Sequence, residues 1–146
     1  MFCRGMLISA LTITMFNSFP VFAKVIEVKM LNRGLEGAMV FEPSYIKADV
    51  GDEIKFIAID KGHNVESIKN MLPPQIKPFK SPMNKDYSLT LEAAGFYGLK
   101  CTPHYGMGMV ALLEVGDVSS SANSAGVKHP GKAKKRFIKL WDLAEK

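Results

Sequence analysis

The chain has 146 residues, of which 47% are hydrophobic, and its formal net charge is +5. This length is enough for one domain with a modest core. Seven basic residues and two acidic ones lie within residues 128–146, so the pI near 9.2 reflects mainly the C-terminus. A basic balance confined to one segment is weak evidence for nucleic-acid binding, and we predict no nucleic-acid partner.

Residues 1–23 have the pattern of a secretory signal. Arg4 precedes an apolar run, and Val21 and Ala23 are small enough for a cut after Ala23. The run is too short to span a bilayer, and no later run reaches about 18 apolar residues. A buried N-terminal helix is the alternative. We predict removal of residues 1–23, no membrane anchor and a location in the periplasm.

The predicted cleavage changes the cysteine count. Cys3 would leave with the signal, and Cys101 would be the single cysteine of the mature chain. An intramolecular disulfide is then excluded. A lone thiol in an exported protein is expected to be buried, metal-bound or functional. Cys101 therefore requires an explanation.

Short apolar segments separated by turn residues predict β-strands from Lys24 to about Val118. We expect a break at Asn32–Gly34 and a bend at Pro43. The predicted strands are residues 25–31, 39–47, 53–59, 87–91, 95–101 and 110–115. About seven strands at this spacing are typical of an all-β sandwich, here assigned to residues 24–118.

Residues 119–146 differ in composition from the rest of the chain. Ser119, Ser120 and Ser121 indicate a linker, and a helical pattern follows from Lys132 to Glu145. We expect this helix to pack on the sandwich with a solvated basic face, although a membrane-surface helix is the alternative. The apolar positions at helical spacing are Phe137, Ile138, Leu140, Trp141 and Ala144.

The segment from Cys101 to Met109 combines side chains that bind soft metals. Within nine residues it offers a thiol, an imidazole and two thioethers, in a tight loop between two predicted strands. His63 lies at a second transition from strand to loop. Cysteine, two histidines and a methionine are the ligand set of a blue-copper site. Taken singly, each of these residues has an ordinary structural explanation, so the prediction rests on their combination.

The predicted strand before the loop assigns different roles to the ligands. Cys101 shares a face with Tyr97 and Leu99, so its thiol should point inward. His104 lies on the loop and should expose a ring edge through which an electron can pass. Met109 is a better axial candidate than Met107 because it adjoins the next strand. His129 has no such neighbours and is expected to be an ordinary surface histidine.

Two other functions use the same residues. A copper chaperone or storage protein would need exposed, exchangeable ligands. A hydrolase would use Cys101 as nucleophile and His104 as base, but the proline between them gives poor geometry and no orienting acid is evident nearby. We therefore predict an electron carrier and no enzymatic activity.

Residues 95–110 and 60–66 closely resemble the copper loop and the first-histidine segment of the cupredoxins, the type 1 blue-copper family, and within it the pseudoazurins. The resemblance extends over about residues 25–118, and a helical tail is also expected of pseudoazurins. It implies a cupredoxin-type Greek-key β-sandwich with a C-terminal helical tail. It further implies one type 1 copper per chain, ligated by His63, Cys101, His104 and an axial Met109.

The resemblance also implies surroundings and partners for this copper. The backbone N–H of Asn64 would donate to the Cys101 sulfur, and Pro103 would lie beside the ligands. Family members carry electrons in the periplasm, typically to nitrite reductase during denitrification, and we expect a monomer with a cytochrome as donor. Docking would use an apolar patch ringed by positive charge, here Met39, Pro103 and Met107 with Arg33, Lys61, Lys80 and Lys100.

Overall fold

Eight β-strands and one α-helix are formed by residues 22–118 and 126–146, the part of the chain that the computed structural model describes. Most of the predicted signal, and the three serines of the predicted linker, lie outside these ranges. The elements are β1 (Val25–Gly34), β2 (Gly37–Glu42), β3 (Tyr45–Ala48), β4 (Glu53–Ile57), β5 (Glu66–Ser67), β6 (Tyr87–Thr90), β7 (Gly95–Lys100), β8 (Val110–Val115) and α1 (Gly131–Ala144).

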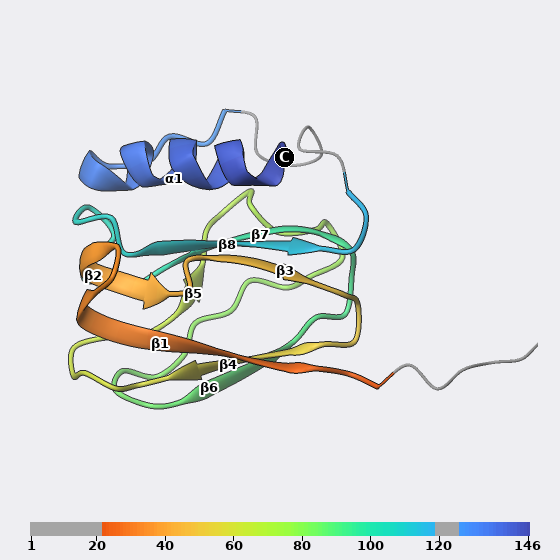
Figure 1. Ribbon diagram of the computed structural model, residues 1–146, viewed down its shortest axis with the longest axis horizontal. Coiled ribbons are helices and arrows are strands. Elements are labelled where there is room, and N and C mark those ends of the chain that lie inside the picture. The colour runs from red at the N-terminus through yellow and green to blue at the C-terminus, as the bar shows by residue number, and fades with distance from the viewer. Residues whose placement is uncertain (1–21, 119–125) are drawn as a thin grey trace, which may run out of the picture.

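The strands form two four-stranded sheets that face each other (Figure 1). One sheet has the order β2-β1-β4-β6 and the other β3-β8-β7-β5. The pairs β1–β4 and β3–β8 are parallel, and the remaining pairs are antiparallel. This arrangement confirms the predicted all-β sandwich with a C-terminal helix.

The core between the sheets is built from alternate residues of each strand. On β4, Ile54 and Phe56 are fully buried, as their alternation predicted, and Val28 and Met30 of the neighbouring β1 join them. The ring of Phe56 meets Phe41 of β2 edge to face, at 5.8 Å between centroids. Burial of such side chains contributes about 1.5–3 kcal/mol each and supplies most of the stability of the sandwich.

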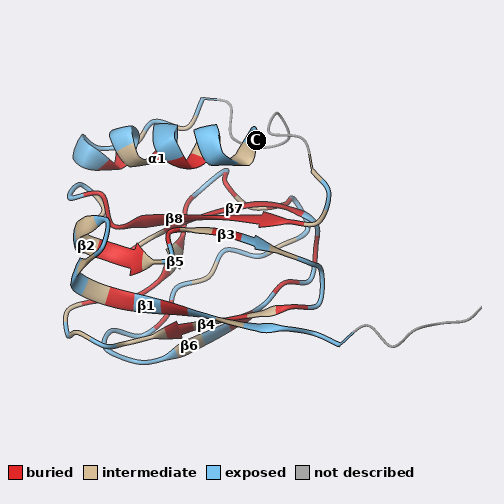
Figure 2. Cartoon of the chain, in the orientation of Figure 1, coloured by how far each residue is buried: buried red, intermediate tan, exposed pale blue. Residues whose placement is uncertain are grey.

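Strands β7 and β8 are buried on both faces because α1 covers the outer face of their sheet (Figure 2). Tyr97 and Leu99 point into the sandwich, while Phe96 faces the helix and meets Trp141 edge to face at 4.8 Å between centroids. A strand buried on both faces loses the alternation of polar and apolar residues. The helix contributes Ala133, Phe137 and Leu140 to this second apolar cluster.

Two details of the sequence interpretation were wrong. Strand β1 does not break at Asn32 but runs on to Gly34, which pairs with Gly37, so the turn lies at Leu35 and Glu36. Ile138 does not belong to the buried helix face, since 54% of it is exposed. Within the described ranges, no helix combines the length and the apolar character needed to cross a membrane.

Candidate metal centre

The loop from Cys101 to Met109, called the ligand loop below, joins the end of β7 to the start of β8 and is compact. Cys101 directly follows β7, and its N–H donates to the carbonyl of Met109 over 2.9 Å. The carbonyl of His104 accepts the N–H of Met109 at 3.1 Å, and the N–H of His104 donates to the carbonyl of Cys101 at 3.2 Å. These three backbone bonds bring the predicted ligands of the loop to one end of the sandwich.

The segment before His63 is held by a neighbouring loop. Gly62 has φ +93°, a conformation that favours glycine, and its N–H donates to Oδ1 of Asn84. The N–H of Asn84 in turn donates to the carbonyl of His63 over 2.8 Å. His63 is thereby fixed on both sides of its backbone and is completely buried.

Three donor atoms converge between these two segments. Nδ1 of His63 and Nδ1 of His104 are 3.2 Å apart, and they lie 3.7 and 3.6 Å from Sγ of Cys101. A point equidistant from the three lies about 2 Å from each, close to the ~2.0–2.3 Å at which a metal such as zinc binds nitrogen and sulfur. One thiol and two imidazoles suit copper in both oxidation states, so the donor set fits this metal.

The two methionines of the loop have different surroundings. Met109 is completely buried and packs in the same core cluster as Cys101. Met107 is 47% exposed. Burial beside Cys101 therefore favours Met109 over Met107 as the weak axial ligand of a blue-copper site.

The thiol of Cys101 lies in a dry environment. Burial raises its pKa, while the backbone N–H groups of Asn64 and His104 donate to the sulfur and act to lower it. The Asn64 contact is the one expected from the resemblance. Metal binding requires the thiolate and would release a proton.

Asn32 determines which nitrogen of His63 faces the donor set. Its Oδ1 lies 3.0 Å from Nε2 of His63, and an amide oxygen can only accept. Nε2 therefore carries the proton and Nδ1 presents its lone pair. Burial, followed by the neighbouring His104, lowers the pKa of His63 and so favours the neutral ring. Sequence reasoning did not identify Asn32, because a separation of 31 residues gives no local pattern.

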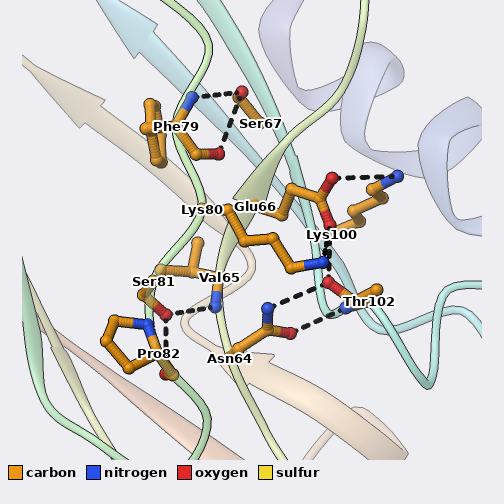
Figure 3. A network of polar contacts seen from close by, with 10 residues as sticks. All are labelled: Asn64, Val65, Glu66, Ser67, Phe79, Lys80, Ser81, Pro82, Lys100 and Thr102. Atoms are coloured by element: carbon orange, nitrogen blue, oxygen red, sulfur yellow. Dashed lines mark hydrogen bonds and ion pairs between the residues drawn. The ribbon is translucent and has the colours of Figure 1, made fainter.

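Asn64, whose backbone N–H donates to the Cys101 sulfur, begins a polar network that runs to the surface. Figure 3 shows this network from Asn64 outward. The side chain of Asn64 bonds Thr102 twice, from Nδ2 to the hydroxyl over 2.9 Å and from the Thr102 N–H to Oδ1 over 2.8 Å. The Thr102 hydroxyl donates to Glu66, whose carboxylate pairs with Lys80 at 3.5 Å and Lys100 at 3.8 Å. Burial acts to raise the pKa of Glu66, but Thr102 and the two lysines lower it overall.

Of the seven residues predicted for docking, five are exposed, and Met39 and Lys100 are partly buried. His104 is partly exposed, in contrast to His63, and Pro103 and Met107 beside it are exposed. Lys61 is exposed, and the next residue, Gly62, lies beside the His104 ring: a Cβ on Gly62 would stand 3.8 Å from Cε1 of His104. The Lys100 ammonium lies 5.1 Å from the centre of the Tyr105 ring. Arg33 and Lys80 are exposed, and Met39 is partly buried with φ +52°.

His129 is not an ordinary surface histidine, so this expectation was wrong. Its Nδ1 lies 2.7 Å from the hydroxyl of Tyr105, and its ring stacks on Phe137 at 4.1 Å between centroids. The polar sequence around it gave no sign of these contacts. They arise because the segment before α1 lies over the ligand loop. Arg136 is a second residue that sequence reasoning missed, and it bonds three backbone carbonyls near the site.

A two-sheet sandwich that gathers a buried thiol and two imidazoles at one end defines a blue-copper protein of the cupredoxin class. A model of copper-binding proteins of the plastocyanin/azurin family matches residues 28–116. The chain is 51% identical to pseudoazurin of Paracoccus pantotrophus over 119 residues, 81% of this chain and 82% of that protein. It is 41% identical to pseudoazurin of Methylorubrum extorquens over 97% of each chain.

A solved structure of similar fold agrees with these relatives. Native pseudoazurin from Hyphomicrobium denitrificans superposes with a TM-score of 0.76 at 38% identity, over 82% of this chain and 97% of that one. The chain belongs to the pseudoazurin family. It is a type 1 copper protein that transfers electrons, and it is not an enzyme.

Proposed function

We propose that the copper is ligated by His63, Cys101, His104 and Met109, and that the protein is a periplasmic one-electron shuttle from a cytochrome to a nitrite reductase. The observation that carries this proposal is the asymmetry of the two imidazoles. His63 is completely buried with Cys101, whereas the ring of His104 is partly exposed at the surface. Electrons would cross at the edge of His104.

The residues around the ligands favour rapid electron exchange. Bound copper supplies the one-electron couple. Asn32 fixes the ring of His63, and the backbone N–H groups of Asn64 and His104 point at the Cys101 sulfur. A site whose ligands are held by such contacts changes shape little when an electron arrives or leaves.

The surface around His104 suits a brief encounter with an acidic partner. Pro103 and Met107 offer apolar contact, and Met39 adjoins the same loop through Arg136. Arg33, Lys61, Lys80 and Lys100 would supply the positive ring. Such charges raise the rate of encounter more than the strength of the complex, which suits a shuttle that acts as a monomer.

A copper chaperone or storage protein is the alternative, and burial of the ligands argues against it. A protein that transfers copper needs ligands that a partner can reach. Here His63, Cys101 and Met109 have no exposed surface.

The visible spectrum of the mature protein with copper(II) tests the ligand set. We expect an intense thiolate-to-copper band in the red, and loss of this band in Cys101→Ser and its alteration in Met109→Leu. The Met107→Leu variant is the matched control and should keep the wild-type spectrum. A colourless protein with intact, reduced Cys101 would contradict the electron-carrier proposal.

Export is supported by the environment of Lys24. The carboxylate of Asp52 accepts the N–H of Lys24 over 2.8 Å, and the preceding Phe22 and Ala23 are exposed. After a cut behind Ala23, the new α-amino group would lie beside this carboxylate. Cell fractionation and N-terminal sequencing should find the protein in the periplasm, beginning at Lys24. A cytoplasmic protein that retains residues 1–23 would contradict the proposed location.

The partner is tested by mixing the reduced protein with a copper-containing nitrite reductase in a stopped-flow experiment. We expect fast bimolecular oxidation that slows steeply as salt is added. A slow rate that does not depend on salt would exclude the reductase as a physiological acceptor.

A further inference from the structure

The C-terminal helix α1 lies directly on the ligand loop. The N–H of Lys132 donates to the carbonyl of Gly106 over 2.9 Å. Gly131 comes so close that a Cβ on it would stand 2.4 Å from the same oxygen. A Cβ on Gly108 would stand 3.1 Å from Cδ of Arg136. The first two turns of the helix therefore touch the segment that carries His104 and Met109.

Arg136 joins the helix to two other parts of the chain. Its Nη1 donates to the carbonyl of Gly108 over 2.7 Å and to that of Met39 over 2.8 Å, and its Nη2 donates to Ala38 over 2.9 Å. Hydrogen bonds from a charged donor are shorter and stronger than neutral ones. The planar guanidinium can serve three acceptors at fixed angles, which a lysine ammonium on a flexible stem cannot reproduce.

The bond to Gly108 controls the peptide unit that leads into Met109. On one side, the Gly108 carbonyl is held by Arg136. On the other side, the N–H of Met109 donates to the carbonyl of His104. Gly108 has φ +94°, so this peptide could rotate more readily than one between two ordinary residues. With both ends bonded its plane is fixed, and with it the Cα of Met109.

We propose that Arg136 is a positioning residue of the copper site, which sets the place of the Met109 thioether relative to His63, Cys101 and His104. The proposal rests on the ligand set proposed above, in which Met109 is axial. The axial ligand of a blue-copper site tunes its reduction potential. The C-terminal helix is then a functional part of the metal centre.

The test compares three variants of the full mature protein loaded with copper. Arg136→Gln removes both the charge and the planar guanidinium, and Arg136→Lys keeps the charge alone. Lys139→Gln is the control, because Lys139 is an exposed residue of the same helix and its loss removes the same charge. We expect both Arg136 variants to shift the thiolate-to-copper band and the reduction potential, and Lys139→Gln to leave both at wild-type values.

Amide hydrogen exchange of the copper-free proteins gives a second readout. The Met109 N–H should exchange at least about tenfold faster in Arg136→Gln, since a hydrogen bond to a charged group is worth that factor or more. Exchange in the centre of β8 should be unchanged.

The outcomes separate positioning from plain stabilisation. If both Arg136 variants unfold at lower temperature but keep the wild-type thiolate-to-copper band and reduction potential, the proposal is overturned. If Arg136→Gln does not fold, Arg136→Lys alone decides the question by the same two measurements. A wild-type protein without the blue spectrum would instead refute the proposed ligand set.

Discussion

Nε2 of His63 lies 3.0 Å from Oδ1 of Asn32, while the other ring nitrogen of His63 faces Sγ of Cys101 at 3.7 Å. Asn32 belongs to β1 and His63 to the segment after β4, two strands that pair in parallel. The parallel pairing of β1 with β4 thus brings the Asn32 oxygen to the proposed ligand His63, 31 positions further along the chain. This contact fixes both the tautomer and the orientation of the ring.

Replacing Asn32 by alanine should weaken copper binding. Without the acceptor, Nε2 and Nδ1 compete for the proton and the ring can rotate, so we expect a loss of about 10- to 100-fold in affinity. Competition with a copper(I) chelator measures this loss. Thr90→Ala, at an exposed position of β6, is the control and should keep wild-type affinity. Equal affinity of the two variants would show that Asn32 does not orient His63.

The contact of Asn32 also shows what the sequence could and could not predict. The sandwich, the inward thiol of Cys101 and the buried Met109 follow from strand alternation and from position in the loop, which are local patterns. The partners of the ligands are not local. Asn32 and Arg136 reach the site through strand pairing and helix packing, and neither carries a motif.

The end of β1 was mispredicted for a related reason. Asn32, Arg33 and Gly34 are typical of a turn, yet the hairpin pairing of Arg33 with Ala38 extends the strand through them. Tertiary pairing outweighed local preference. That extension belongs to the same strand from which Asn32 reaches His63.

Thr102→Val should destabilise the copper-free protein by about 1–2 kcal/mol, because the variant leaves the Asn64 amide and the Glu66 carboxylate without their shared hydroxyl. Urea unfolding measures the difference. Thr90→Val makes the same change on an exposed strand and should be nearly neutral. If both variants lose the same stability, the network of Figure 3 contributes nothing beyond a local preference.

Neutralising Lys61 should slow electron transfer to an acidic reductase more than neutralising Lys100. Lys100 is already paired with Glu66, and only 23% of its side chain is exposed. Lys61 is exposed and has no ion pair within the described part of the chain. Stopped-flow rates at low salt should fall further for Lys61→Gln, and the difference should vanish near ~1 M salt, where charges are screened within about 3 Å.

The control for this comparison is Lys47→Gln, since Lys47 pairs with Glu114 on β8, toward the end away from the ligand loop. Its rate should match that of the wild type. If electron transfer is slower for Lys100→Gln than for Lys61→Gln, the prediction that the unpaired Lys61 contributes more to the encounter is wrong.

Acid should weaken the contact between His129 and the ligand loop. Burial lowers the pKa of His129 in the folded chain below 6.5, the value expected for the unfolded chain. Just below pH 6.5 the unfolded chain therefore binds a proton at His129 that the folded chain does not bind. Stability therefore falls as the pH drops through about 6.5, by at most about 1.4 kcal/mol per pH unit for one proton, and levels off below the folded pKa. Urea unfolding of the copper-free protein between about pH 7.5 and 5.5 measures this slope.

His63 shifts in the same direction, so the wild-type slope alone does not isolate His129. The His129→Gln variant does, because it retains His63. Its stability should depend less on pH than that of the wild type. Parallel curves would show that His129 titrates alike in the folded and unfolded chains.

Gly131→Ala should separate α1 from the ligand loop. Gly131 has φ +51°, and a Cβ there would meet the Gly106 carbonyl oxygen at 2.4 Å. Gly51→Ala is the matched control, since Gly51 has φ +99° with nothing within 4 Å of its Cβ position. Both variants bear backbone strain of about 1–3 kcal/mol, but only Gly131→Ala must also displace the loop. We expect Gly131→Ala alone to lose copper faster to a chelator, since the displaced loop carries His104 and Met109, whereas equal copper loss would mean that the loop holds its geometry without the helix.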